Sequence, residues 1–255
     1  MIGAIAGDII GSRFEVIPTK SYDFDLFSEL NTYTDDTVLT VAIADAILSG
    51  ASYEFKLKEY GRKFPDAGYG GSFVRWIMGD IQGPYNSYGN GAAMRVSPVG
   101  FACSSREEVM REARRTAMVS HDHPDGIRGA QATALAVFLA KQNFSKSDIK
   151  SELEHTFQYD LNRSLNQIRP DYKFEISCQK SVPESIIAFL ESVDYEDAVR
   201  KAVSLGGDSD TMACIAGGIA QAFYKEIPQE IVENVYERIP AAFKKIVILF
   251  EERYL

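Results

Sequence analysis

LGGDSDTMACIAGGIAQAFY, residues 205–224, places two acids, a serine and a threonine directly in front of an apolar run of mostly small residues. These polar residues commonly begin helices, and the run behind them has the character of a buried helix. Asp208 is a candidate N-cap, with Asp210 and Thr211 in the first turn, where unpaired N–H groups and the helix dipole favour anions. An ordinary helix cap therefore accounts for the stretch, and a ligand site for the clustered oxygen atoms is the alternative.

The composition is that of a soluble globular protein. The chain has 255 residues, of which 45% are hydrophobic and 25% charged, and no linker rich in proline, glycine or serine divides it. We therefore expect one domain over residues 1–255. No apolar run approaches the roughly 20 residues that span a bilayer, and the N-terminus has no basic segment typical of a signal peptide. A cytoplasmic location without membrane contact is the expectation.

Charge and cysteine content exclude several classes of function. The formal net charge of −9 indicates no general affinity for nucleic acid, so any phosphate binding must be local. Cys103, Cys178 and Cys214 are odd in number and widely spaced, which argues against a disulfide framework and against a zinc site built on cysteine. They are expected to be buried thiols.

Hydrophobic periodicity predicts helices almost throughout. Leu39, Ala42, Ile43, Ala46 and Ile47 follow the helical spacing in residues 35–50, behind a polar start. Similar patterns occupy residues 106–120, 127–142, 146–157, 181–192, 195–205 and 229–255. Only DYKFEIS, residues 171–177, suggests a strand. Small residues in segments 3–12 and 213–222 would let helices approach closely, so the predicted fold is all-α, a compact bundle of many helices.

A second acid-rich helix start is predicted at TDDT, residues 34–37. Thr34, Asp35 and Asp36 precede an apolar helix, as Asp208 and Asp210 do. Carboxylate and hydroxyl oxygens suit Mg²⁺ or Mn²⁺, and converging carboxylates would repel one another without a cation. The two segments are either one metal site or two independent caps.

Two further segments carry groups suited to a ligand. In YNSYGNGAAMRVSPVG, residues 85–100, glycines flank Asn90 at a predicted helix start, where backbone N–H groups could hold a phosphate. The segment is not a Walker A loop, and a tight turn is the alternative. In SHDHPDGIRGAQA, residues 120–132, His121 and His123 lack the companions of a zinc site, so a hydrogen-bonding role is expected. His155 is expected at the surface.

These segments, in this order, resemble the ADP-ribosylglycohydrolase family, which includes the dinitrogenase reductase-activating glycohydrolase. The resemblance covers nearly the whole chain, from GAIAGDIIGSRFE through TDDT, SYGNGAAMR and SHDHPDGIRGA to SVPESIIAFLES and GGDSDTMACIAGGIAQAFY. It implies an all-α fold with two Mg²⁺ or Mn²⁺ ions at the centre of the bundle. The metal ligands that it implies are Thr34, Asp35, Asp36, Asp208, Asp210 and Thr211. Ser209 departs from the threonine of many relatives, but it lies between the ligands.

The resemblance also implies the reaction and the remaining site residues. The ions would bind the hydroxyl groups of the distal ribose and activate water for attack on the anomeric carbon. Glu15 matches a glutamate with a gating or acid/base role, and Asp35 is the rival acid. The residues that would contact the rest of the substrate are Ser87, Tyr88, Gly89, Asn90 and Gly91 at the diphosphate and His121 in the same cleft. Adenine would stack on Tyr88, with Tyr85 as the second choice.

The expected function is hydrolysis of the glycosidic bond between ADP-ribose and an acceptor, either a protein side chain or a small conjugate. The alternatives are a metal-dependent nucleotide phosphohydrolase, a non-catalytic ADP-ribose-binding module and a crystallin-like structural protein that has kept the fold. Acids at both helix starts argue against the last two, because a protein that only binds or packs gains nothing from carboxylates that repel one another. Arginine, serine and acetyl ester linkages all remain open.

Overall fold

The computed structural model describes residues 1–255, and all of its regular elements are helices, so the predicted all-α fold is confirmed. In chain order they are α1 (Ile2–Val16), α2 (Asp35–Ser49), α3 (Tyr53–Lys63), α4 (Gly71–Met78), α5 (Gly91–Met94), α6 (Ser97–Ala102), α7 (Arg106–Met118), α8 (Pro124–Lys141), α9 (Lys146–Phe157), α10 (Leu165–Ile168), α11 (Cys178–Leu190), α12 (Tyr195–Val203), α13 (Ser209–Tyr224), α14 (Gln229–Arg238) and α15 (Ala241–Tyr254).

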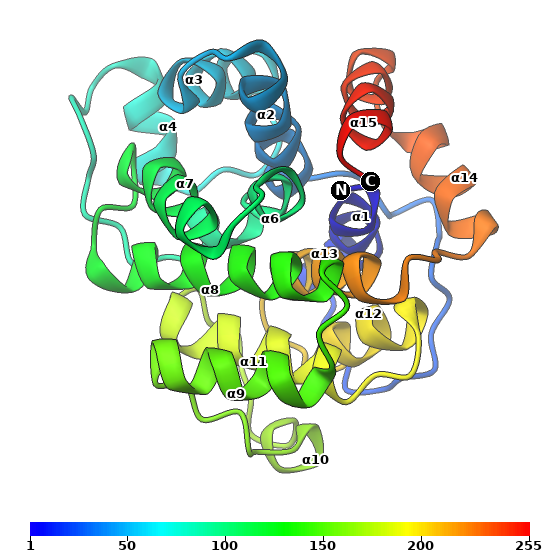
Figure 1. The fold of residues 1–255 in the computed structure, drawn as a ribbon. Helices are drawn as coiled ribbons and strands as arrows, with labels where there is room; N and C mark the ends of the chain where they lie inside the picture. The colour runs from blue at the N-terminus through cyan, green and yellow to red at the C-terminus, as the bar shows by residue number, and fades with distance from the viewer.

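Helices α1 and α13 pack against each other at the centre of the bundle (Figure 1). Glycines allow their backbones to touch. A methyl group on Gly7 would lie 2.0 Å from the carbonyl oxygen of Ala213, and one on Gly217 would lie 2.4 Å from that of Gly3. The small-residue pattern of both segments therefore reflects a contact that larger side chains would prevent.

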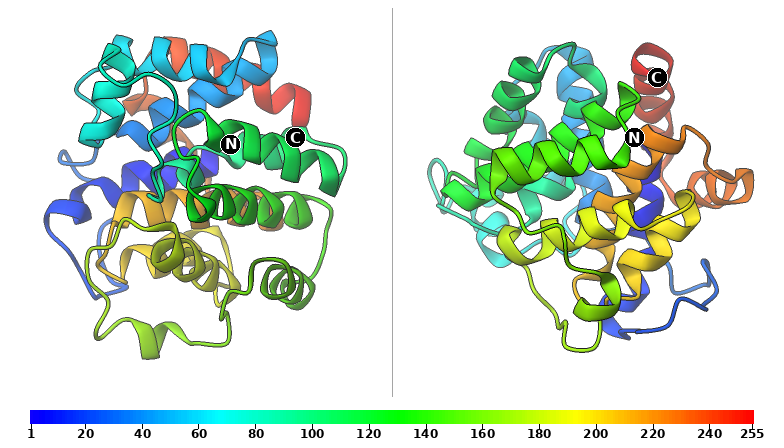
Figure 2. Two further views of the ribbon diagram at one scale, coloured as in Figure 1. Left: turned by 90° about the vertical axis from the view of Figure 1, so that its left-hand side faces the viewer. Right: turned by 60° about the horizontal axis from the view of Figure 1, so that its bottom comes forward.

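The other helices surround this pair. Helix α8 packs against α13 and carries α7 on another side, while α11 and α12 also contact α13. Figure 1 and the two turned views of Figure 2 place α2, α3, α4 and α7 on one side of α8, and α9, α10 and α11 on the other. The buried apolar side chains form one cluster of 69 residues. Every residue of α13 from Ser209 to Ala222 is buried, which explains why its sequence is apolar on all sides.

The strand suggested for residues 171–177 is wrong. These residues form no strand, and only one isolated bridge joins Ser177 to Gly89. The Asn90 N–H donates to Ile176 O at 2.8 Å, and the Cys178 N–H donates to Tyr88 O at 3.0 Å. A strand needs a partner of several residues, and the short loop beside this segment cannot provide one.

Residues 229–255 are helical as predicted, but they form two helices. Helix α14 ends at Arg238, and α15 begins after Pro240. Proline lacks an N–H donor and disfavours the helical conformation of the residue before it, which here is Ile239 in an extended conformation. None of the helices combines the length and the apolar character that crossing a membrane would require.

Candidate active site

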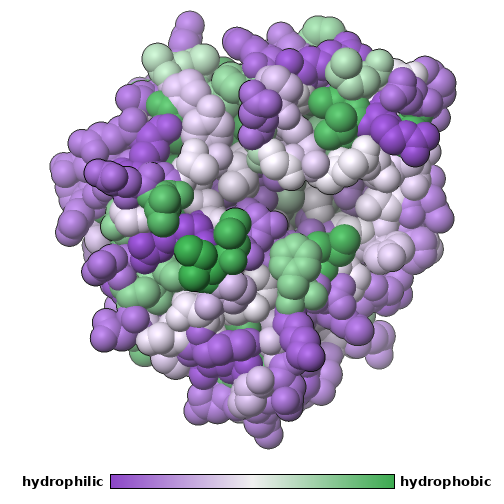
Figure 3. Space-filling model, turned by 180° about the vertical axis from the view of Figure 1, so that it is seen from behind, coloured by the Kyte–Doolittle hydropathy of each residue, from purple (hydrophilic) through white to green (hydrophobic).

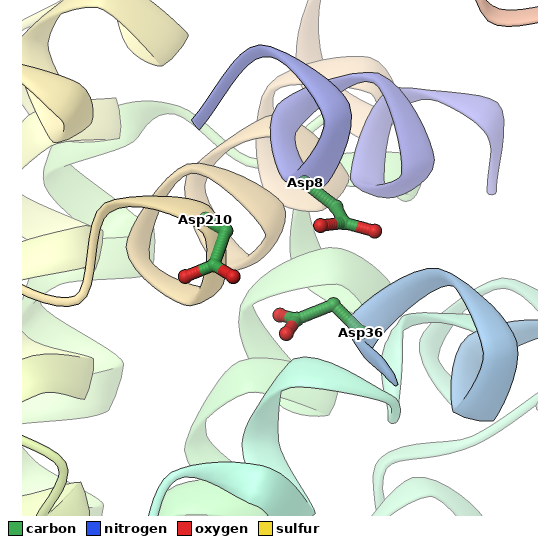
Figure 4. Close-up of side chains that lie close together, drawn as sticks. All are labelled: Asp8, Asp36 and Asp210. Carbon is green, nitrogen blue, oxygen red and sulfur yellow. The ribbon is translucent and has the colours of Figure 1, made fainter. Parts of the chain in front are cut away.

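The acid-rich starts of α2 and α13 meet beside the middle of α1, as Figure 4 shows for the carboxylates of Asp8, Asp36 and Asp210. Two groups of carboxylates are close enough to share a cation. One group consists of Asp8, Asp36 and Asp210, and the other of Glu15, Asp208 and Asp210. Within each group, each residue has one carboxylate oxygen that lies within 4.8 Å of the corresponding oxygens of the other two. Asp210 belongs to both groups and joins them.

Asp8 was not among the residues predicted from the sequence. Its side chain is fully buried and accepts hydrogen bonds from the Thr34 N–H at 3.0 Å, the Thr34 hydroxyl at 2.7 Å, and the N–H and hydroxyl of Thr37. Because both Asp8 oxygens are engaged in this way, we interpret Asp8 as the anchor that fixes the start of α2. An acid inside an otherwise apolar helix start was the available signal.

The helix starts differ in how they are capped. At α2, the Thr34 side chain accepts from the Asp36 N–H, as an N-cap residue does. At α13, Asp208 occupies the N-cap position but makes no capping bond, and its side chain accepts from Asn90 Nδ2 at 2.7 Å. The Asp208 carboxylate therefore faces the glycine-rich loop instead of its own helix.

Crowding and burial raise the pKa of the acids at this site. Burial is the largest cause, and the charge of Asp210 is the next. The pKa of Asp8 rises to about 7. The other carboxyl groups with a raised pKa are Glu15, Asp35, Asp36 and Asp208. Several carboxylates thus lie in an environment that disfavours their charged form unless a cation is present.

The oxygen atoms fit a hard divalent cation. Asp36 Oδ1 is buried and has no hydrogen-bond partner, while Asp36 Oδ2 accepts from the Thr211 hydroxyl at 3.2 Å. A buried carboxylate oxygen without a partner is rare in proteins, and a metal ion would satisfy it. Asp35 lines the same cavity but belongs to neither group of close carboxylates.

A cavity of about 410 Å³ lies over the acids, within the size range of small-molecule sites. The predicted residues that line it are Glu15, Thr34, Asp35, Asp36, Ser87, Gly89, Asn90, Gly91, His121, Asp208, Asp210 and Thr211. Five segments that are distant in the sequence are thus brought to one cavity. Figure 3 shows the molecule from behind, with a hollow near its centre and apolar side chains beside it.

The glycine-rich loop is held in place by its own hydrogen bonds. The Gly89 N–H donates to Ser87 Oγ at 3.1 Å, and the Asn90 N–H is bound to Ile176 O. These two donors are therefore occupied, whereas the N–H groups of Ser87, Tyr88 and Gly91 have no partner within the protein. Fewer backbone N–H groups of this loop therefore remain for a ligand than its glycine-rich sequence suggests.

The two candidate tyrosines lie in different places. Tyr85 lines the cavity, with its ring centre 5.7 Å from that of His121. Tyr88 does not line it: the side chain is 53% exposed and packs edge-on against His123 at 5.7 Å. His155 is exposed, as expected.

A family model for ADP-ribosylglycohydrolase matches residues 1–255, the whole chain. The chain belongs to the ADP-ribosylglycohydrolase family. It is accordingly a glycohydrolase, and the acids and the glycine-rich loop of the cavity are those that carried the resemblance in the sequence.

Similar proteins cover nearly the whole of this family member. Human ADP-ribosylhydrolase ARH3 is 28% identical over 304 residues, covering 88% of this chain and 84% of its own. ADP-ribosylarginine hydrolase Tri1 of Pseudomonas putida is 23% identical over 269 residues, covering 92% and 72%. A solved structure described as an ADP-ribosylglycohydrolase-related protein complex has a TM-score of 0.75 at 21% identity, covering 100% of this chain and 96% of that one. That last similarity concerns the fold.

Sequence reasoning missed two further walls of the glycohydrolase cavity. One is the segment from Gly68 to Phe73 at the start of α4, and the other consists of Phe174 and Ile176 in the segment before α11. The run GYGGS, residues 68–72, was a signal for the first, since glycines at a helix start also mark the loop at Gly89. Phe174 and Ile176 are 57% and 51% exposed, and their alternation with polar residues is the pattern that suggests a strand in the sequence.

Proposed function

We propose that this glycohydrolase cleaves the glycosidic bond between ADP-ribose and an acceptor, which is an ADP-ribosylated protein side chain or a small ADP-ribose conjugate. The observation that carries the proposal is one cavity lined by two different kinds of group. Acids from α1, α2 and the start of α13 line it, and so do the glycine-rich loop and His121. A ligand with a ribose at one end and a diphosphate beyond it matches that division. We treat residues 1–255 as one functional unit.

Two Mg²⁺ or Mn²⁺ ions are the proposed cofactors. The proposed ligands are Thr34, Asp35, Asp36, Asp208, Asp210 and Thr211. The unpartnered oxygen of Asp36 and the two groups of close carboxylates support this assignment. When bound, such ions act as Lewis acids that orient hydroxyl groups and lower the pKa of water.

The protein's own acids would supply the proton transfer. The Glu15 side chain lines the cavity at its exposed edge, and desolvation together with the charge of Asp210 raises its pKa, which favours the protonated form that a general acid needs. Asp35 remains the rival. Glu15 belongs to the group of close carboxylates with Asp208 and Asp210, whereas Asp35 belongs to neither group, so we favour Glu15.

The distal part of the ligand would lie along the glycine-rich loop. The free N–H groups at Ser87 and Gly91, two residues that line the cavity, are the proposed donors for the diphosphate. Tyr85 is within the cavity and Tyr88 outside it, so in this structure Tyr85 is the better placed ring for adenine. Phe174, which is exposed and lines the same cavity, adds a second aromatic face.

The test of the reaction is an analysis of products with Mg²⁺ or Mn²⁺ present. Free ADP-ribose and an unmodified acceptor are expected. AMP or inorganic phosphate would instead identify a phosphohydrolase, and absence of any product would favour a binding module or a structural protein. The panel of substrates should include arginine, serine and acetyl ester linkages, because all of them present the same ADP-ribose to the cavity.

A further inference from the structure

Arg95 is the one lysine or arginine that lines the cavity, among five acids. Its side chain is fully buried, makes no ion pair, and leaves Nε and Nη1 without hydrogen-bond partners. Burial lowers its pKa to about 10, which still leaves it charged at neutral pH. A buried charge without an ion-pair partner lowers the stability of the fold, which points to a role for Arg95 at the site.

The bonds that Arg95 does make lead to His121. Arg95 Nη2 donates to Thr116 O at 2.9 Å and to Ser120 Oγ at 2.8 Å, and Ser120 Oγ lies 2.8 Å from His121 Nδ1. The other ring nitrogen, Nε2, faces the glycine-rich loop: it would lie 3.1 Å from a methyl group on Gly91. Nε2 makes no hydrogen bond within the protein.

Donor and acceptor counting favours a proton on Nε2 of His121 over one on Nδ1. A guanidinium can only donate, so the bond from Arg95 uses a lone pair of Ser120 Oγ. The single proton of Ser120 is then free to be donated to His121 Nδ1. Tyr85 also lies close to Ser120. Burial raises the pKa of the Tyr85 phenol to about 12, so the phenol keeps its own proton and does not need to accept the proton of Ser120. Burial and the nearby charge of Arg95 lower the pKa of His121, which keeps the ring neutral.

We propose that Arg95 and Ser120 are positioning residues that hold His121 with its proton on Nε2, so that the ring presents an N–H donor to the diphosphate held by the glycine-rich loop. Arg95 also contributes the positive charge behind that loop. The inference rests on the proposed function, since it takes ADP-ribose as the ligand. It explains why a buried guanidinium lies in a cavity whose other charged side chains are all acids.

The orientation of His121 can be tested without any ligand. The NMR resonances of ¹⁵N-labelled histidine show which ring nitrogen is protonated. The resonances of His121 are identified as those that are missing from the spectrum of His121→Gln. At a pH where the ring is neutral, we expect a protonated Nε2 and an Nδ1 that accepts a hydrogen bond. Ser120→Ala should shift the Nδ1 resonance, and Ser185→Ala should not, because the buried Ser185 hydroxyl bonds within its own helix. A proton on Nδ1 in the unaltered protein would overturn the proposal.

The effect on binding is tested by a double-mutant cycle, with ADP-ribose titrated into the Mg²⁺-loaded protein. Ser120→Ala should weaken binding about tenfold, the range for a hydrogen bond to a charged group. In a His121→Ala background the same change should alter binding less than about twofold, since the serine acts through the histidine. Ser185→Ala is the matched control and should leave affinity unchanged.

The outcomes separate this inference from the function on which it rests. If the unaltered protein binds ADP-ribose but Ser120→Ala keeps its full effect without His121, the positioning role is wrong and the proposed function stands. If the unaltered protein does not bind ADP-ribose, the proposed function fails, and with it the assignment of the ligand. Arg95→Met should weaken binding at least as much as Ser120→Ala. The serine variant keeps the proposal testable if that arginine variant does not fold.

Discussion

Asp210 lies where the two groups of carboxylates meet, at the first turn of α13. Its charge is the second cause of the raised pKa of every other acid at the site, after burial. A single residue therefore controls much of the electrostatic repulsion that a cation would relieve. Replacing it affects both metal binding and the stability of the metal-free protein, in opposite directions.

Asp210→Ala should lower kcat by more than about a hundredfold, since even residues that only support a metal ligand are worth 10- to 100-fold. The metal-free variant should melt no lower than the unaltered protein, because the change removes repulsion among buried carboxylates. Steady-state kinetics and thermal denaturation in chelator measure the two effects. Full turnover in this variant would remove Asp210 from the site.

Asp8 is proposed to act on the metal site indirectly, by anchoring the start of α2. It accepts from the N–H and hydroxyl groups of Thr34 and Thr37, three of them at Oδ2 and one at Oδ1, so the NH₂ group of an asparagine in its place would face either three of these donors or one. Asp8→Asn should weaken Mn²⁺ binding by about 10- to 100-fold while leaving the helices formed. Titration of the metal measures this, with the exposed Asp80→Asn as the matched control. Equal affinities in the two variants would contradict the anchoring role.

At the scale of elements, the site depends on how closely α1 approaches α13. A methyl group on Gly11 would lie 2.4 Å from Ser209 O and 2.5 Å from the Asp210 Cα. These are backbone atoms, which cannot rotate away as a flexible side chain can. The position of the acid in α13 is therefore set in part by a glycine in α1.

Gly11→Ala should lower the free energy of unfolding by about 3 kcal/mol or more, and should weaken metal binding because Asp210 moves. Gly70→Ala is the control, since a methyl group there meets nothing within 4 Å. Chemical denaturation and metal titration report the two effects. A stable Gly11→Ala protein with normal metal affinity would show that the helices can separate without disturbing the site.

At the scale of the whole molecule, the buried acids couple folding to metal and to pH. Ions bound by the folded state alone stabilise it, by about 2.7 kcal/mol for one site when free metal exceeds Kd a hundredfold. Mg²⁺ or Mn²⁺ should therefore raise the melting temperature, and chelator should lower it. A melting temperature indifferent to both would argue against the dinuclear site.

The metal-free protein should become less stable as the pH rises. The pKa of Asp8 is about 7 in the folded protein against an ordinary value of 3.8, so between these values the folded state holds more protons than the unfolded state. The free energy of unfolding then falls with rising pH over that interval. Melting curves in chelator from about pH 5 to pH 8 measure this, and Asp210→Ala should flatten the dependence. A metal-free protein that gains stability over that range would contradict the raised pKa.

The sequence by itself determined the helices and most of the candidate site. Helical periodicity and small-residue runs predicted the all-α fold, because burial on one helix face leaves a local pattern. Motifs placed acids at the starts of α2 and α13, since a helix start is defined by residues adjacent in the chain. The division of residues 229–255 at Pro240 also follows from local chemistry.

Only the tertiary structure decided what those segments do together. Asp8 lies inside an apolar run of the sequence, and only the fold places it against Thr34 and Thr37. Residues 171–177 alternate as a strand does, but no partner strand lies beside them, so Phe174 and Ile176 line the cavity instead. Arg95 reaches His121 through Ser120 across 25 residues of chain. Such contacts join residues distant in the sequence, and their hydrogen bonds and charges depend on distances that a local pattern does not encode.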